Sequence, residues 1–146
     1  KERDKRLLVA PMKMSSRVRG KYLEILSQEQ YSHVVRIVDG RRPLEEFLTL
    51  FAQHQSTLSP PGRGYDCFRT WQALAVGTIP LVTYNAAFDE RLYKDTGPEY
   101  LPHPADLTCE ILNQLLLSLT DPSRHFSHLE IENWRQRWHS AGELQT

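Results

Sequence analysis

The amino-acid sequence predicts an α/β fold: a Rossmann-like open, mainly parallel sheet with helices on both faces. Short apolar or β-branched runs alternate along the chain with longer segments whose apolar residues recur at helical spacing. This order is typical of parallel strands joined by helices. The length of 146 residues suits one domain, since a chain of this size buries roughly 68–70% of its unfolded surface. We therefore expect residues 1–146 to form a single domain with its own core.

The first half of the chain predicts two strands and two helices in alternation. Residues 7–10 form an apolar run and residues 34–38 a β-branched run, so both are expected to be strands. Ser15 or Ser16 can cap the first helix, and Pro43 suits the first position of the second helix. The apolar faces of the two helices are predicted to carry Val18, Tyr22, Ile25, Leu26, Leu44, Phe47, Leu48 and Phe51.

The alternation continues with a strand at residues 56–59, a helix over about residues 66–76 and a strand at residues 79–84. The segment 85–104 is rich in proline, glycine and charged residues, so we expect it to be mostly loop.

The last third of the chain predicts further short elements and two helices. A short helix is expected at about residues 88–93, and residues 100–101 are expected to be extended. Two C-terminal helices are expected within about residues 105–140; Asp106 can cap the first, and residues 121–123 end it. Their apolar stripes are Ile111, Leu112, Leu115, Leu116 and Leu119 in the first helix and Ile131, Trp134 and Trp138 in the second. The tryptophans fit core packing or a contact with another domain.

Composition excludes several function classes. The chain carries 18 basic and 18 acidic residues, so its net charge favours neither nucleic acid nor an anionic membrane as a partner. No apolar run approaches the roughly 20 residues of a membrane span. Cys67 and Cys109 lack a metal-ligand spacing, and His125 and His128 have no further partner nearby, so we expect no metal site. The two cysteines fit buried thiols or a disulfide. Because Lys1 stands where a Met would begin a chain, we expect a processed product or part of a longer protein.

The most specific pattern lies between the third predicted strand and the third predicted helix, in the loop Pro60-Pro61-Gly62-Arg63-Gly64. The prolines stiffen the entry, and the glycines allow positive φ and close approach of a ligand to the backbone. The helix after the loop presents free backbone N–H groups and the positive end of its dipole. This arrangement can bind a diphosphate, although plain turns have the same composition.

On that helix, Asp66, Arg69 and Gln72 are spaced three apart, so they form one polar stripe. Arg69 can clamp a phosphate through two parallel hydrogen bonds or hold Asp66 in place. A plain surface ion pair between these two residues is the alternative. The opposite, buried stripe is predicted to carry Cys67, Trp71, Leu74 and Ala75.

The stretch from Ser59 to Pro80 resembles the nucleotide-sugar-binding half of exostosin-like glycosyltransferases. The family pattern runs Ser-Pro-x-Gly-x-Gly-x-Asp-x-x-Arg-x-Trp-Glu-Ala-Leu-x-x-Gly-x-x-Pro. The residues that match it in order and spacing are Ser59, Pro60, Gly62, Gly64, Asp66, Arg69, Trp71, Ala73, Leu74, Gly77 and Pro80. Gln72 departs from the pattern, because the family usually has there an acid that accepts hydrogen bonds from ribose or sugar hydroxyls. The resemblance is strong over residues 56–82 and faint elsewhere.

This resemblance implies the C-terminal, donor-binding lobe of a GT-B-type glycosyltransferase. Such an enzyme transfers a sugar from a nucleotide sugar to an acceptor hydroxyl, with inversion and without a tightly bound cofactor or metal. The acceptor is a glycan or a protein. A second lobe or partner chain completes the cleft and supplies the general base, so no catalytic residue is named in this chain. The resemblance also implies a location in the secretory pathway or the Golgi lumen.

The resemblance further implies which residues bind the nucleotide sugar. Arg17 and Arg19, at the start of the first helix, stand where the family has a basic residue that reaches the donor phosphates; solvated surface charge is the alternative. Arg63 is either a phosphate ligand or an exposed loop cation. The expected donor-binding residues are Arg17, Arg19, Ser59, Pro60, Gly62, Arg63, Gly64, Asp66, Arg69 and Gln72.

Two other functions stay open at this stage. Gln72 keeps an acceptor oxygen but lacks the charge of a carboxylate, which predicts weaker donor binding or a catalytically degenerate domain kept as a structural or interaction subunit. An unrelated nucleotide-binding enzyme ranks last, since the three-glycine dinucleotide fingerprint with its downstream acid is absent.

Overall fold

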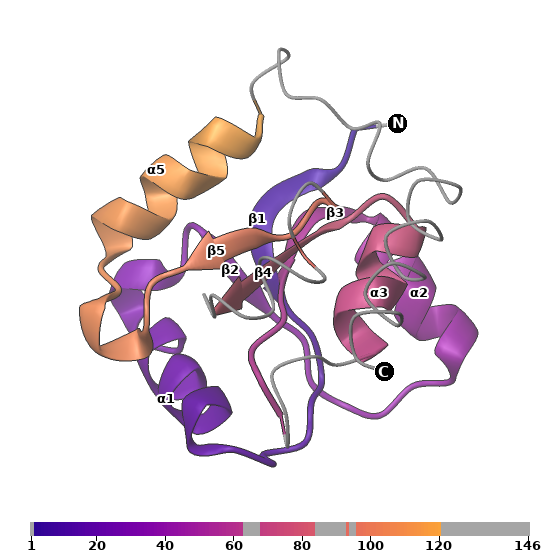
Figure 1. Ribbon diagram of the computed structural model, residues 1–146, viewed down its shortest axis with the longest axis horizontal. Helices are drawn as coiled ribbons and strands as arrows, with labels where there is room; N and C mark the ends of the chain where they lie inside the picture. Colours follow the sequence, from indigo (N-terminus) through magenta and orange to yellow (C-terminus); the bar gives the residue numbers. More distant parts are fainter. Residues whose placement is uncertain (1, 63–67, 84–92, 94–95, 121–146) are drawn as a thin grey trace, which may run out of the picture.

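A computed structural model of the chain describes residues 2–62, 68–83, 93 and 96–120. Its centre is a five-stranded sheet in the order β2-β1-β3-β4-β5, in which each neighbouring pair of strands is parallel (Figure 1). The strands are β1 (Asp4–Val9), β2 (Val35–Ile37), β3 (His54–Leu58), β4 (Ile79–Thr83) and β5 (Glu99–Leu101). The predicted α/β fold with a parallel sheet is confirmed by this topology.

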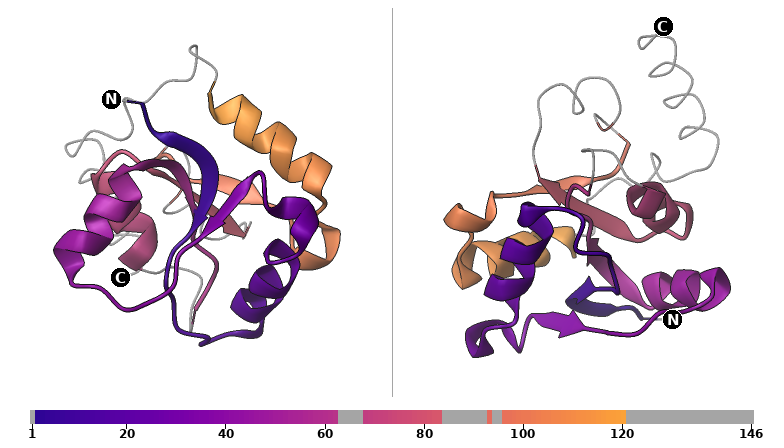
Figure 2. Two further views of the ribbon diagram at one scale, coloured as in Figure 1. Left: turned by 180° about the vertical axis from the view of Figure 1, so that it is seen from behind. Right: turned by 90° about the horizontal axis from the view of Figure 1, so that it is seen from below.

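Helices cover both faces of the sheet. The helices are α1 (Arg17–Leu26), α2 (Leu44–Ala52), α3 (Phe68–Ala75) and α5 (Cys109–Leu119), with short 3-10 helices η1 (Glu29–Tyr31) and η3 (Pro104–Asp106). α1 and α5 lie on one face, and α2 and α3 lie on the other (Figure 2). The doubly wound arrangement therefore follows the predicted alternation of strands and helices.

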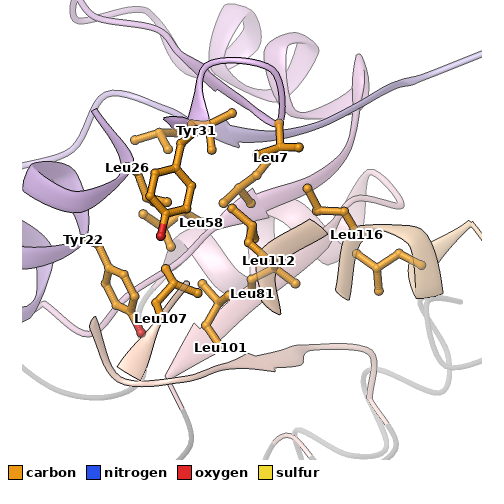
Figure 3. Packing of buried hydrophobic residues seen from close by; sticks show 14 of the residues in the cluster. Leu7, Tyr22, Leu26, Tyr31, Leu58, Leu81, Leu101, Leu107, Leu112 and Leu116 are labelled. Carbon is orange, nitrogen blue, oxygen red and sulfur yellow. The ribbon is translucent and has the colours of Figure 1, made fainter. Parts of the chain in front are cut away.

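Strand β1 supplies both halves of the core, because successive side chains of a strand point to opposite faces. Leu7 and Val9 join the larger cluster under α1 and α5, where the side chains of Tyr22 and Leu112 are fully buried (Figure 3). Leu8 points the other way and packs with residues of α2 and α3. Each fully buried leucine stabilises the fold by about 1.5–3 kcal/mol relative to an exposed one. The central strand is thus fixed from both sides.

Three helix caps are decided by the structure. Ser16, and not Ser15, caps α1 with its side chain. Pro43 precedes α2 instead of opening it, because its ψ of 155° is extended. Asp106 does not cap the long helix as predicted, because residues 104–106 form a 3-10 turn first; Thr108 then caps α5 from an extended conformation.

Other element boundaries also differ from the prediction. β1 begins at Asp4, three residues earlier than expected, and residues 99–101 form a full fifth strand beside β4. Ala75 is exposed although the helical spacing placed it on the buried stripe, because it is the last residue of α3. The predicted final helix at residues 131–138 lies outside the described residues, as does nearly all of the predicted short helix at 88–93.

Candidate functional site

The strand order places a topological switch point between β1 and β3. From β1 the chain passes through α1 to β2 on one side, and β3 then returns to the other side of β1. In doubly wound sheets with this 2-1-3-4-5 order, ligands bind outside the carboxyl ends of the strands at the β1/β3 point. The loop that follows β1 and the loop that follows β3 meet at this edge. The predicted glycine loop is the second of these two.

Side chains tie the two loops together. The Ser16 hydroxyl donates a hydrogen bond of 2.7 Å to the carbonyl oxygen of Pro61. From α3, the Arg69 Nη2 donates at 2.7 Å to the carbonyl oxygen of Pro11, and Nη1 makes a longer contact of 3.5 Å with that of Ala10. The carboxyl ends of β1 and β3 are therefore joined into one connected surface.

Arg19 lies at the centre of this junction and is only 8% exposed. Its Nη1 donates to the carbonyl oxygen of Lys13 at 3.0 Å and to the hydroxyl of Ser15 at 3.2 Å. Within the described part of the chain, its Nε is buried and has no hydrogen-bond partner. A guanidinium keeps its charge in proteins, and a buried donor without a partner is costly. The junction therefore holds a fixed positive charge with an unused hydrogen-bond donor.

Gly62 is the residue against which Arg19 packs. A Cβ atom at this position would lie 2.9 Å from Nη2 of Arg19, 3.1 Å from its Cζ and 3.2 Å from Oγ of Ser15. Real Cβ atoms essentially never approach a heavy atom within 3.0 Å. The absence of a side chain at Gly62 is thus what allows the buried Arg19 to sit between the two loops.

Arg69 also touches the second helix of its layer. Its Cζ lies 5.2 Å from the ring centroid of Phe47 in α2, within the range of a cation–π interaction. The side chain is half-buried and links α3, which carries it, to α2 and to the loop after β1.

The other predicted site residues are distributed unevenly. Arg17 is exposed at the first position of α1, and Gln72 is half-buried one turn after Arg69 on α3. Ser59 and Pro60 are buried, and the Ser59 hydroxyl shares a hydrogen bond of 2.8 Å with Thr70 inside the protein. The structure thus brings Arg19, Gly62 and Arg69 to the junction, whereas the Ser59 hydroxyl faces α3. The predicted residues Arg63, Gly64 and Asp66 lie outside the described residues, and so does Cys67.

Sequence reasoning missed several residues of this junction. Ser16 was expected only as a helix cap, and its bond to Pro61 had no sequence signal. The burial of Thr70 does have a sequence signal. Thr70 lies three and four residues before Ala73 and Leu74, so all three share the buried face of α3. The role of Phe47 as a platform for Arg69 depends on how α2 and α3 pack, which no local pattern encodes.

A second polar cluster lies at the amino ends of the strands. His54 is fully buried, and its Nδ1 donates to the carbonyl oxygen of Leu50 at 2.8 Å, so Nε2 is the acceptor that faces Nη1 of Arg36 at 3.1 Å. Burial lowers the pKa of His54. The carboxylate of Asp4 receives hydrogen bonds from Arg6, which are the main cause that lowers the pKa of Asp4 to about 2. The His54–Arg36 contact links β2 to the start of β3, and the Asp4 carboxylate of β1 lies 3.8 Å from Nε2 of His54.

A surface hollow of about 470 Å³ opens at the same amino edge. It is lined by Glu2, Arg3, Lys5, Gln55, Gly77, Ile79 and Thr120. Because open α/β sheets bind ligands at the opposite edge, we do not take this hollow as the candidate site. Among the described residues, no group of three or more histidine, cysteine or acidic side chains is placed to hold a metal ion. In that same portion of the chain, every helix is too short or too polar to cross a bilayer.

Comparison with known proteins leaves the family open. No family model and no curated protein matches the chain. A solved structure described as an alpha1,3-fucosyltransferase matches with a TM-score of 0.47 and 13% identity, over 97% of this chain and 46% of that chain. The chain therefore spans about half the length of that structure. At a TM-score below 0.5 the likeness is weak, so the fold assignment rests on the sheet topology, and the exostosin-like resemblance stays a prediction.

Proposed function

We propose that this chain is the donor-binding lobe of a glycosyltransferase and that it holds the diphosphate of a nucleotide sugar at the junction of the loops after β1 and β3. The observation that carries the proposal is the buried Arg19, whose Nε lacks a partner among the described residues and whose guanidinium packs against Gly62. A diphosphate oxygen is the kind of acceptor that satisfies such a donor.

The residues around the junction suit a departing nucleoside diphosphate. Arg19 and Arg17 lie in the first turn of α1, where the helix dipole adds positive potential. A fixed guanidinium neutralises the charge that develops on the leaving phosphate. Gln72 accepts a hydrogen bond from a ribose or sugar hydroxyl in this proposal. The whole proposed donor site, whether its residues touch the ligand or hold the loops around it, comprises Arg17, Arg19, Ser59, Pro60, Gly62, Arg63, Gly64, Asp66, Arg69 and Gln72.

The remaining features of the activity are proposed from the resemblance alone. Transfer is inverting, the nucleotide sugar is bound as a substrate without a tightly held cofactor, and the acceptor is a glycan or protein hydroxyl. A second lobe or partner chain supplies the general base. The proposed location is the secretory pathway or the Golgi lumen.

A second candidate function is a catalytically degenerate lobe that serves as a structural or interaction subunit. Gln72 favours it, because an amide in place of the usual acid removes an ionised acceptor from the donor site. Fold alone does not separate the two functions.

Calorimetric titration with uridine and guanosine diphosphate sugars tests the proposal. The concentrations should reach the millimolar range, where the binding free energy is only about −4 kcal/mol. We expect Arg19→Met, which keeps an unbranched side chain but removes the guanidinium and its charge, to weaken binding by about tenfold to a hundredfold. Lys21→Ala, which removes an exposed cation from the same helix, is the matched control and should bind as the wild type does.

Gln72→Glu separates the two candidate functions. In a working donor lobe, the restored acid preserves or tightens binding, because an ionised acceptor makes the stronger hydrogen bond. If neither the wild type nor Gln72→Glu binds any donor while circular dichroism shows an intact fold, the degenerate lobe is the better description.

A further inference from the structure

We propose that Arg69 is a positioning residue that fixes the loop after β1, and through this loop Arg19, instead of gripping the ligand itself. That the loop is held in this way follows from contacts within the chain. The consequence for donor binding rests on the proposed function.

The contacts of Arg69 define its role. Both of its terminal nitrogens, the pair with which a guanidinium grips a phosphate, are directed at carbonyl oxygens of the loop: Nη2 at Pro11, 2.7 Å away, and Nη1 at Ala10, 3.5 Å away. The ring of Phe47 supports the guanidinium from α2 at 5.2 Å. A side chain held by a carbonyl on one side and by an aromatic ring on another has its orientation fixed.

The same loop then holds Arg19. The Lys13 carbonyl and the Ser15 hydroxyl, two and four residues beyond Pro11, accept the hydrogen bonds of Arg19 Nη1. Arg69 and Arg19 therefore grip one short loop at its start and its end. Loss of Arg69 releases the start of the loop and with it the acceptors that orient Arg19.

The rate of trypsin cleavage after Lys13 measures how often the loop after β1 opens. Lys13 is exposed, but a protease cuts only when the loop around it opens. When opening is fast relative to cleavage, the rate tracks the population of the open form. We expect Arg69→Ala to raise the rate of cleavage after Lys13 about tenfold or more, because a hydrogen bond from a charged donor shifts a local equilibrium by about that factor. Cleavage after Arg41, exposed in the loop that follows β2, is the internal reference.

Arg3→Ala is the matched control. Arg3 also donates to backbone carbonyls, at His54 and Val76, but at the amino edge of the sheet. The Arg3→Ala substitution should leave the ratio of the cleavage rate after Lys13 to the cleavage rate after Arg41 unchanged. General loss of stability raises both rates together, so the ratio separates local positioning from a merely structural role. Methylguanidinium added to Arg69→Ala should bring the ratio back toward the wild-type value.

The outcomes decide the two proposals separately. An unchanged ratio in Arg69→Ala overturns the positioning role, and so does a ratio that Arg3→Ala raises equally. Weaker donor binding by Arg69→Ala with an unchanged ratio would make Arg69 a direct ligand. If the wild type binds no donor, the proposed function fails while the cleavage ratio still tests the positioning role. Should Arg69→Ala not fold, Arg69→Lys, which keeps the charge but not the forked donor, is measured in its place and is expected to raise the ratio as well.

Discussion

Substitution of Gly62 by alanine tests the packing of the loop junction. The added Cβ would lie 2.9 Å from Nη2 and 3.1 Å from Cζ of Arg19, whereas favourable contacts between carbon atoms lie at about 3.5–4.0 Å. The guanidinium must therefore shift by roughly half an ångström or more. It cannot do so freely, because its Nη1 is hydrogen-bonded to Lys13 and Ser15.

The magnitude follows from two opposing effects. Overpacking of a buried site costs about 1–3 kcal/mol. Replacement of a glycine by alanine in a conformation that alanine accepts returns about 0.4–1 kcal/mol by restricting the unfolded chain. We expect Gly62→Ala to lower the free energy of unfolding by about 0.5–2 kcal/mol in urea titrations followed by circular dichroism.

Gly20→Ala is the matched control within the same region. Gly20 lies inside α1, and an added Cβ would meet nothing within 4 Å. Alanine is the better helix former there, so this variant should gain about 0.5–1 kcal/mol. The two glycine substitutions are thus predicted to have opposite signs.

A double-mutant cycle assigns the cost of Gly62→Ala to Arg19. In an Arg19→Ala background the clash is gone, so Gly62→Ala should become neutral or stabilising, with a coupling free energy of about 1 kcal/mol or more. Strict additivity of the two substitutions, or a stable Gly62→Ala protein with the wild-type unfolding midpoint, would refute the reasoning from contact distances.

Two further predictions concern pH and the amino edge of the sheet. Burial lowers the pKa of His54 below 6.5, so its neutral ring contributes stability that is present above pH 6.5 and is lost as the pH falls through the folded pKa. Between pH 7.5 and 5, the free energy of unfolding should fall more steeply for the wild type than for His54→Gln, by up to about 1.4 kcal/mol per pH unit, and equal slopes would contradict the buried neutral ring. The hydrogen bond from Arg6 is the main cause that lowers the pKa of Asp4 from 3.8 to about 2, so its contribution is present above pH 3.8 and is lost as the pH falls through 2. Acid titration between pH 4 and 2 should therefore show a smaller loss of stability in Asp4→Asn than in the wild type, and identical acid transitions would argue against the Asp4–Arg6 contact.

The order of strands and helices was predictable because local patterns encode it. Apolar residues at helical spacing located α1, α2, α3 and α5, and apolar or β-branched runs located β1, β2 and β4, whereas β3 was expected from the alternation and from the glycine loop that follows it. Boundaries were harder where two residues of similar propensity compete. Asp106 and Thr108 are both good helix caps, and the 3-10 turn that begins at Pro104 decides between them. The third residue of β5 is buried against its neighbours, but a three-residue strand is too short to show a period.

The candidate site was predictable only in part. The sequence predicts that the glycine loop and the arginines of α1 and α3 bind a ligand. Their partners were not predictable, because the acceptors of Arg19 and Arg69 are mostly backbone carbonyls, which every residue carries. Which carbonyl an arginine meets depends on how α3 packs against the loop after β1, a tertiary fact that sequence spacing does not record.

The buried charge of Arg19 connects the glycine pattern to the proposed function. A buried ion is rarely the most stable solution, since a well-packed apolar side chain of similar volume is often as stabilising or more so. Among the described residues, carbonyl and hydroxyl oxygens accept the hydrogen bonds of Arg19 Nη1, and Nε is left without a partner. The anionic ligand proposed above would account for such an arrangement by pairing with this charge. Gly62 then follows from Arg19, because a Cβ at this position would lie 2.9 Å from Nη2 and force the guanidinium to shift. The glycine of the loop is required by the arginine beneath it, whether or not a phosphate also approaches its backbone.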